Sequence, residues 1–227
     1  MTAAGVHRPP PGAAQARLAS RPALTSLRMP WLYLVSRRAP AAVGLLAALG
    51  ALLWAALHWN WSVAGGPAAQ QLVPLVIETG AAAVIAVTTY GPFGDTERAT
   101  GRWLPWLRLG TALLLTAAAA GALAAGASGG HLPGGTLAML RNLSGMTGTG
   151  LLAAAALGGA FAWTGPMAYM LVTEGALAGG WTTPWIWPGR PPHDLGGALC
   201  ACGVFAAGIV AVTLLGARDS SRRPAPE

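Results

Sequence analysis

Six apolar stretches, each close to the length that crosses a lipid bilayer, constrain the fold of this chain more than any other feature. They run over about 41 to 57, 72 to 90, 109 to 127, 143 to 163, 166 to 180 and 195 to 217. A helix needs roughly 20 mostly apolar residues to cross the hydrocarbon core of a bilayer, because it rises about 1.5 Å per residue. In lipid, only helices and closed barrels satisfy every backbone hydrogen bond. The pattern therefore predicts an all-α polytopic membrane bundle of about six transmembrane helices.

The fourth and fifth stretches are separated only by the segment from Trp163 to Pro166. Its glycine and proline favour a tight turn between two separate helices. A single long, kinked helix is the alternative interpretation of the same residues.

The amino-acid composition agrees with a membrane protein. Only 9% of the residues are charged, whereas a soluble domain has roughly 25% because its surface faces water. All 14 basic residues are arginine and none is lysine, and the chain is rich in alanine and glycine. This codon-driven bias leads us to expect a bacterial source with a GC-rich genome.

The chain divides into a membrane region and two tails. Residues 1–27 are rich in alanine, proline and arginine without apolar periodicity, which predicts a disordered cytoplasmic tail. They are not a secretory signal, because the first apolar stretch begins only near residue 39 and further stretches follow it. The transmembrane domain is expected over residues 28–217 and a short cytoplasmic tail over residues 218–227.

The arginines predict the orientation in the membrane. They concentrate in the N-terminal segment, in the loop after the second stretch and in the C-terminal tail, and the segments between these are nearly neutral. Arginine and lysine are enriched on the cytoplasmic side of membrane proteins, and tryptophan is enriched at the membrane interfaces, where most tryptophans of this chain are expected. We therefore expect a multi-pass protein of the cell membrane with both termini in the cytoplasm.

Three ionisable residues lie inside or at the edge of the apolar stretches. Glu78 and Glu174 should lie about 9 Å from the outer ends of their helices, given the helical rise per residue, and Arg141 should lie at an outer edge. A charge at the middle of a bilayer costs roughly 2.5 kcal/mol or more, so each should face protein or water. The two carboxylates could meet each other or pair with Arg141. A structural ion pair and a substrate or proton site both remain open.

The residue types needed for several chemistries are missing. A phosphate-binding P-loop and a Schiff-base enzyme both require a lysine. His58, His131 and His193 all fall on the outer side but have no metal-ligand spacing. The sequence thus predicts no metal, no cofactor, no catalytic residues and no nucleic-acid partner.

An intramembrane serine protease of the rhomboid type is the enzyme that six spans would suit. That family has a Gly-x-Ser-Gly motif and a histidine in a later span. Here Ser144 follows Leu143 and lacks the leading glycine, and the last apolar stretch contains no histidine. We therefore expect that the chain is not an enzyme.

The loop after the second stretch is the most polar part of the membrane region. It runs Asp95-Thr96-Glu97-Arg98-Ala99-Thr100-Gly101-Arg102, and Asp95 or Thr96 can cap a short helix there. Upstream, residues 28–38 mix aromatic, aliphatic and arginine side chains. They suit a helix in the cytoplasmic interface or a simple extension of the first span.

This order of parts resembles the permease subunits of type-2 ABC exporters, which have an N-terminal interfacial helix, six spans and an acidic-basic coupling helix between the second and third spans. The resemblance covers about 28 to 217 and is one of layout. It implies that Asp95, Glu97, Arg98 and Arg102 contact a separate ATP-binding cassette subunit. The segment from Trp181 to Pro188 departs from the family, because it replaces the amphipathic re-entrant hairpin expected between the fifth and sixth spans.

The resemblance implies a permease subunit of an ATP-driven exporter that works as a homodimer or heterodimer in the lipid bilayer. ATP hydrolysis would then take place on the partner. Two alternatives belong to other classes: a membrane scaffold or anchor without transport, and an ion-coupled carrier that uses Glu78 and Glu174.

Overall fold

The computed structural model describes residues 38–59, 67–88, 104–128 and 130–215. These residues form six α-helices and two short 3₁₀ turns, η2 (Gly159–Phe161) and η3 (Trp187–Gly189), and no strand occurs among them. The helices are α3 (Ala39–His58), α4 (Pro67–Thr88), α6 (Leu104–Ala127), α7 (Gly135–Leu157), α8 (Thr164–Ala178) and α9 (Leu195–Leu215). The predicted all-α fold is confirmed.

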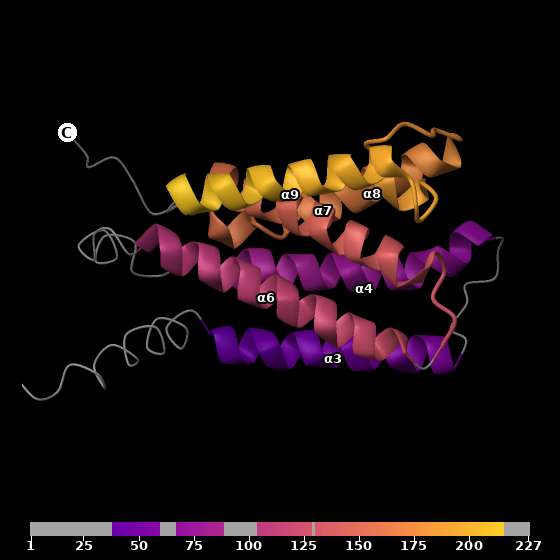
Figure 1. The fold of residues 1–227 in the computed structure, drawn as a ribbon, viewed down its shortest axis with the longest axis horizontal. Helices are drawn as coiled ribbons and strands as arrows, with labels where there is room; N and C mark the ends of the chain where they lie inside the picture. The colour runs from indigo at the N-terminus through magenta and orange to yellow at the C-terminus, as the bar shows by residue number, and fades with distance from the viewer. Residues whose placement is uncertain (1–37, 60–66, 89–103, 129, 216–227) are drawn as a thin grey trace, which may run out of the picture.

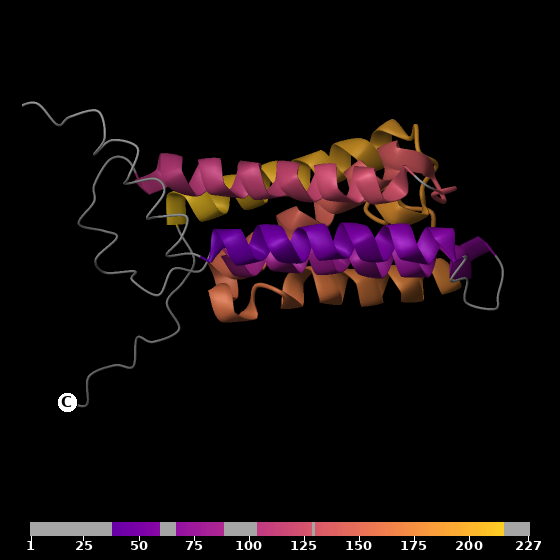
Figure 2. The ribbon, with the colours of Figure 1, turned by 90° about the horizontal axis from the view of Figure 1, so that it is seen from below.

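The six helices run side by side along the long axis of the molecule, and each runs opposite to the one before it (Figures 1 and 2). One end of the bundle, which we call the proximal end, holds the start of α3 and the end of α9. The opposite, distal end holds the end of α3, the start of α4, and the ends of the helices that meet between α6 and α7 and between α8 and α9. An even number of passes therefore brings Arg38 and Leu215 to the same end.

Four helices are long and apolar enough to cross a membrane: α3, residues 71–88 of α4, α6 and α9. They expose large apolar side chains to the surroundings. Leu195, Leu199 and Leu214 on α9, for example, are each more than 70% exposed. Water would disfavour so much exposed apolar surface, whereas lipid accepts it. The chain is a membrane-embedded helical bundle.

The centre of the bundle is α7, which packs against α4, α8 and α9. Arginine, asparagine, threonine and glycine interrupt its apolar residues, and most of its side chains are buried. A helix that packs against other helices can carry polar residues where they face protein. This explains why α7 is not among the four spanning candidates, although it has 23 residues.

Close helix packing depends on glycines at two crossings. A Cβ atom on Gly126 of α6 would overlap the backbone carbonyl of Gly50 on α3. At the second crossing, a Cβ atom on Gly208 of α9 would lie 2.6 Å from the carbonyl oxygen of Gly148 on α7. Small residues of this kind let helix backbones approach closely in membranes, where van der Waals packing drives association.

Helix α7, which corresponds to the fourth predicted stretch, differs most from its predicted position. It begins at Gly135, eight residues earlier than expected, and it ends at Leu157, six residues earlier. The prediction placed Arg141 at an outer edge of the span. Arg141 and its neighbour Asn142 are instead buried inside the bundle.

The alternative of one kinked helix through residues 163–166 is wrong, because α7 and α8 are separate and antiparallel. Gly158 ends α7 with φ +98°, a backbone conformation that other residues rarely adopt. The turn therefore occupies residues 158–163, and most of it precedes the predicted segment from Trp163 to Pro166. Pro166 lies in the first turn of α8, where a missing N–H leaves no helical hydrogen bond unmade.

Several predicted features lie outside the described residues. These are the interfacial helix over residues 28–37, both tails, and the loop residues Asp95, Glu97, Arg98 and Arg102.

Candidate functional site: a polar cavity at the distal end

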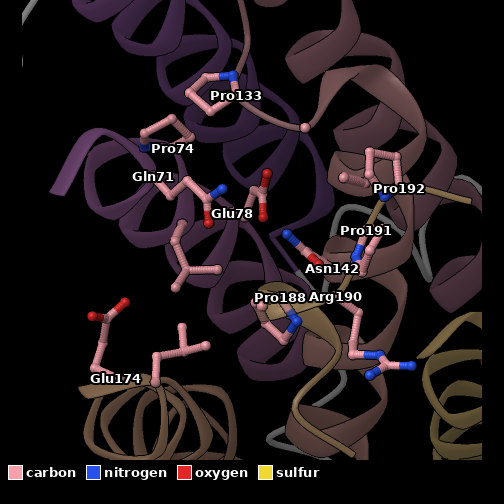
Figure 3. A pocket seen from close by; sticks show the side chains of 15 residues that line it. Gln71, Pro74, Glu78, Pro133, Asn142, Glu174, Pro188, Arg190, Pro191 and Pro192 are labelled. Carbon is pink, nitrogen blue, oxygen red and sulfur yellow. The ribbon is translucent and has the colours of Figure 1, made fainter. Parts of the chain in front are cut away.

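A cavity of about 410 Å³ opens at the distal end, between α4, α7, α8 and the connection that joins α8 to α9 (Figure 3). Five polar or charged side chains line it: Gln71, Glu78, Asn142, Glu174 and Arg190. Five prolines give it a stiff rim: Pro74, Pro133, Pro188, Pro191 and Pro192. Its volume falls within the roughly 300–1,000 Å³ typical of small-molecule sites.

Glu78 is the most deeply buried acid in the part of the chain that the structure describes. It projects from α4 and is only 3% exposed. Its Oε2 atom has no hydrogen-bond partner among the described residues. Asn142 on α7 is 8% exposed, and its amide nitrogen points toward the Glu78 carboxylate (Figure 3), while its Oδ1 atom also lacks a partner. Two buried acceptors thus occur at one wall of the cavity.

Glu174 enters the same cavity from α8, on the side across from Glu78 (Figure 3). The structure therefore brings together the two acids that the sequence singled out, although they lie 96 positions apart in the chain. Within the described ranges, no ion pair joins either acid to Arg141. The substrate or proton role considered for these acids stays a prediction.

Arg141 lies six residues inside α7, not at its edge as expected, and it is 6% exposed. Its Nη1 atom donates a hydrogen bond to the Pro191 carbonyl at 2.7 Å, and its Nη2 atom donates to the Arg190 carbonyl at 2.9 Å. Arg141 therefore ties the central helix to the α8–α9 connection.

The α8–α9 connection is a folded structure that reaches into the bundle. Ile186 and Trp187 are 1% and 2% exposed. The indole of Trp187 occupies a notch at Gly145 of α7, where any Cβ atom would overlap the ring. The ring of Tyr169 of α8 stacks on the indole, with 4.3 Å between ring centroids, and the Tyr169 hydroxyl donates to the Trp185 carbonyl at 2.7 Å. Trp187 is an internal anchor, whereas the sequence suggested an interfacial tryptophan.

Arg190 and Asp194 form a charge cluster at the end of the connection, directly before α9 begins. Arg190 donates to both carboxylate oxygens of Asp194, at 3.0 and 2.8 Å, and to the Thr182 carbonyl at 2.7 Å. Asp194 also accepts the backbone N–H of Gly197 at 2.6 Å, as a helix N-cap does. The Arg190 guanidinium, followed by the Gly197 N–H, lowers the pKa of Asp194 to about 2. The hydrogen bonds from Arg190 to Asp194 in turn hold the pKa of Arg190 above its usual value.

Sequence reasoning missed Asn142, Gln71 and the folded connection. The signal for Asn142 was its place beside Arg141 within an apolar segment. The signal for the folded connection was the dense run of tryptophan and proline in residues 181–192. The three outer histidines do not gather into a site, and His58 stacks on Trp54 instead. No group of three His, Cys, Asp or Glu residues that could hold a metal occurs in the described part of the chain.

The chain matches no protein-family model, no curated protein and no solved structure. The resemblance to ABC exporters therefore remains one of layout.

Proposed function

We propose that this protein is the membrane-spanning permease subunit of an ATP-driven ABC transporter, of the exporter type, in a bacterial cell membrane. The observation that carries the proposal is the position of the two described residues that flank the loop between α4 and α6. Thr88 and Leu104, which flank this loop, both lie at the proximal end, as do Arg38 and Leu215 (Figure 1). A coupling loop must share a side with a cytoplasmic N-terminal helix, and this layout satisfies that requirement.

The arginine distribution supports the orientation that this proposal needs. Eleven of the chain's arginines fall in the two terminal segments and in the loop between α4 and α6, or at their borders: Arg8, Arg17, Arg21, Arg28, Arg37, Arg38, Arg98, Arg102, Arg218, Arg222 and Arg223. The described residues that border these segments, namely Arg38, Thr88, Leu104 and Leu215, lie at the proximal end. By the positive-inside rule, that end faces the cytoplasm and the cavity opens toward the other side.

In the proposed mechanism, two permease subunits bind two ATP-binding cassette subunits, which hydrolyse the ATP. Asp95, Glu97, Arg98 and Arg102 contact the ATPase. Closure of the ATPase dimer displaces this loop and tilts α4 and α6, to which the loop is directly joined. The cavity at the distal end then changes shape, because α4 forms one of its walls.

Copurification tests this proposal. The wild-type protein, extracted in a mild detergent, should retain an ATP-binding cassette protein from its native host. The double variant Glu97→Arg, Arg98→Glu should lose it, since removing one partner of a charge-assisted contact typically costs about 2–5 kcal/mol in binding.

The matched control reverses another adjacent acid-base pair, with Arg218→Glu and Asp219→Arg in the C-terminal tail. This control should still retain the ATPase. If the wild type retains no ATPase, the scaffold or the ion-coupled carrier becomes the better explanation. ATP-independent uptake into vesicles would then favour the carrier.

A further inference from the structure

The distal cavity has two buried acceptor atoms whose hydrogen-bonding capacity is unused. The Oε2 atom of Glu78 and the Oδ1 atom of Asn142 are both buried and have no partner among the described residues. A buried carboxylate oxygen without a partner is costly. A ligand that donates hydrogen bonds would remove that cost, so the cavity is suited to a donor.

When Glu78 and Glu174 are both ionised, the charges around the cavity leave a negative excess. Glu78 and Glu174 line it without an ion-pair partner in the described ranges, and the guanidinium of Arg190 is held by Asp194. Arg141 contributes one positive charge behind the wall, but both of its terminal nitrogens already donate to backbone carbonyls. Two carboxylates against one such arginine leave room for one further positive charge.

The shape favours an organic cation over a bare ion. The cavity of about 410 Å³ is much larger than a metal ion needs, and Leu75 and Leu177 add apolar surface beside the acids. No cluster of three His, Cys, Asp or Glu side chains that would bind a metal occurs in the described part of the chain. An ammonium group can donate N–H bonds to Glu78 while its organic body packs on the leucines and prolines.

We propose that the distal cavity binds a small organic ammonium ion, whose N–H groups donate to Glu78 and Asn142 and whose charge is balanced by Glu78 and Glu174. The site exists in the membrane subunit alone and does not depend on an ATPase partner. Failure of the ATPase copurification would therefore leave this proposal standing, and failure of amine binding would leave the ATPase contact standing.

The first test measures binding of radiolabelled 2-phenylethylamine to the full chain in lipid nanodiscs. The neutral isostere 2-phenylethanol and sodium chloride serve as competitors. We expect saturable amine binding that 2-phenylethanol does not displace. Glu78→Gln should weaken binding at least about tenfold, since a charge-assisted hydrogen bond is lost. Glu174→Gln, on a half-buried side chain, should weaken it less. Glu227→Gln at the C-terminus is the matched control and should bind as the wild type does.

A gain-of-affinity variant gives a test that misfolding cannot imitate. Asn142→Asp adds a carboxylate to the same wall and should tighten binding of the amine. Absence of saturable binding by the wild type, equal displacement by 2-phenylethanol, or unchanged affinity in Glu78→Gln would each overturn the proposal.

A second measurement uses only the wild-type protein. Dicyclohexylcarbodiimide modifies carboxyl groups in apolar surroundings, and mass spectrometry of the peptide that contains Glu78 reports the extent. We expect 2-phenylethylamine to slow this modification and 2-phenylethanol to leave it unchanged. Protection by sodium but not by the amine would identify an inorganic cation site instead and would refute the organic ligand.

Discussion

Replacement of Trp187 by alanine should be among the most destabilising single changes in the distal half of the protein. The side chain is 2% exposed and contacts both the notch at Gly145 and the ring of Tyr169. Truncation leaves a void that the helix backbone of α7 cannot fill by moving. Replacing a buried tryptophan by alanine typically costs about 3–5 kcal/mol, a range that includes the lost packing and the cavity. Loss of the stacked pair accounts for about 0.5–1.5 kcal/mol of interaction with Tyr169.

Trp181 provides a matched control, because it lies in the same connection but is 57% exposed. Both variants remove the same number of atoms. The free energy of unfolding, measured by titration of the purified protein from mild detergent into sodium dodecyl sulfate, should fall by about 3–5 kcal/mol for Trp187→Ala. It should change by less than about 1 kcal/mol for Trp181→Ala, as expected at an exposed position. Equal losses in the two variants would refute the conclusion that Trp187 anchors the connection.

Three further outcomes are expected. Acidification from about pH 4 to about pH 2 should loosen the α8–α9 connection. The pKa of Asp194 is lowered to about 2 in the folded protein. The stability that the ionised Asp194 contributes is therefore fully present above the unfolded pKa of about 3.8 and is lost as the pH falls through the folded value. Hydrogen exchange over the connection should report this loosening, and Asp194→Asn should abolish the dependence within this window. Arg141→Met should lower the free energy of unfolding by about 2 kcal/mol or more, because two hydrogen bonds from a charged group are lost. Exposure of the Pro191 carbonyl to water in the variant would make this loss of stability smaller. A cysteine placed at Ala68 should react with an impermeant maleimide added outside the cell, whereas one at Ser220 should not, and the opposite pattern would reverse the proposed orientation.

The sequence was sufficient to predict the spanning helices. Predicted and observed bounds for α3, α4, α6 and α9 agree within about five residues, because an apolar run of the right length has few other stable conformations in a membrane. The short length of α8 was also anticipated. The apolar surface that these helices expose to lipid is what makes their positions predictable from hydropathy.

The centre of the bundle was harder to predict. A buried helix surrounded by other helices can carry Arg141 and Asn142, and its sequence then looks like the edge of a span. The approach of Glu78 to Glu174 required the packing of α4 against α8, which hydropathy does not encode. The role of Trp187 depended on the notch at Gly145, 42 positions earlier in the chain. Contacts of this kind follow from tertiary structure alone.

The position of α7 has a consequence for how the protein is made. This helix is enclosed by α4, α8 and α9, and it is the least suited of the long helices to contact lipid directly. Arg141 has its hydrogen-bond partners only once the connection before α9 has been synthesised. During synthesis, α7 leaves the ribosome before both α8 and α9, so it must wait beside α4 or within the insertion machinery until its remaining neighbours arrive. A chain that stops before α9 would leave one side of its polar central helix uncovered in the bilayer. We expect membrane proteases to recognise such a truncated chain as misfolded.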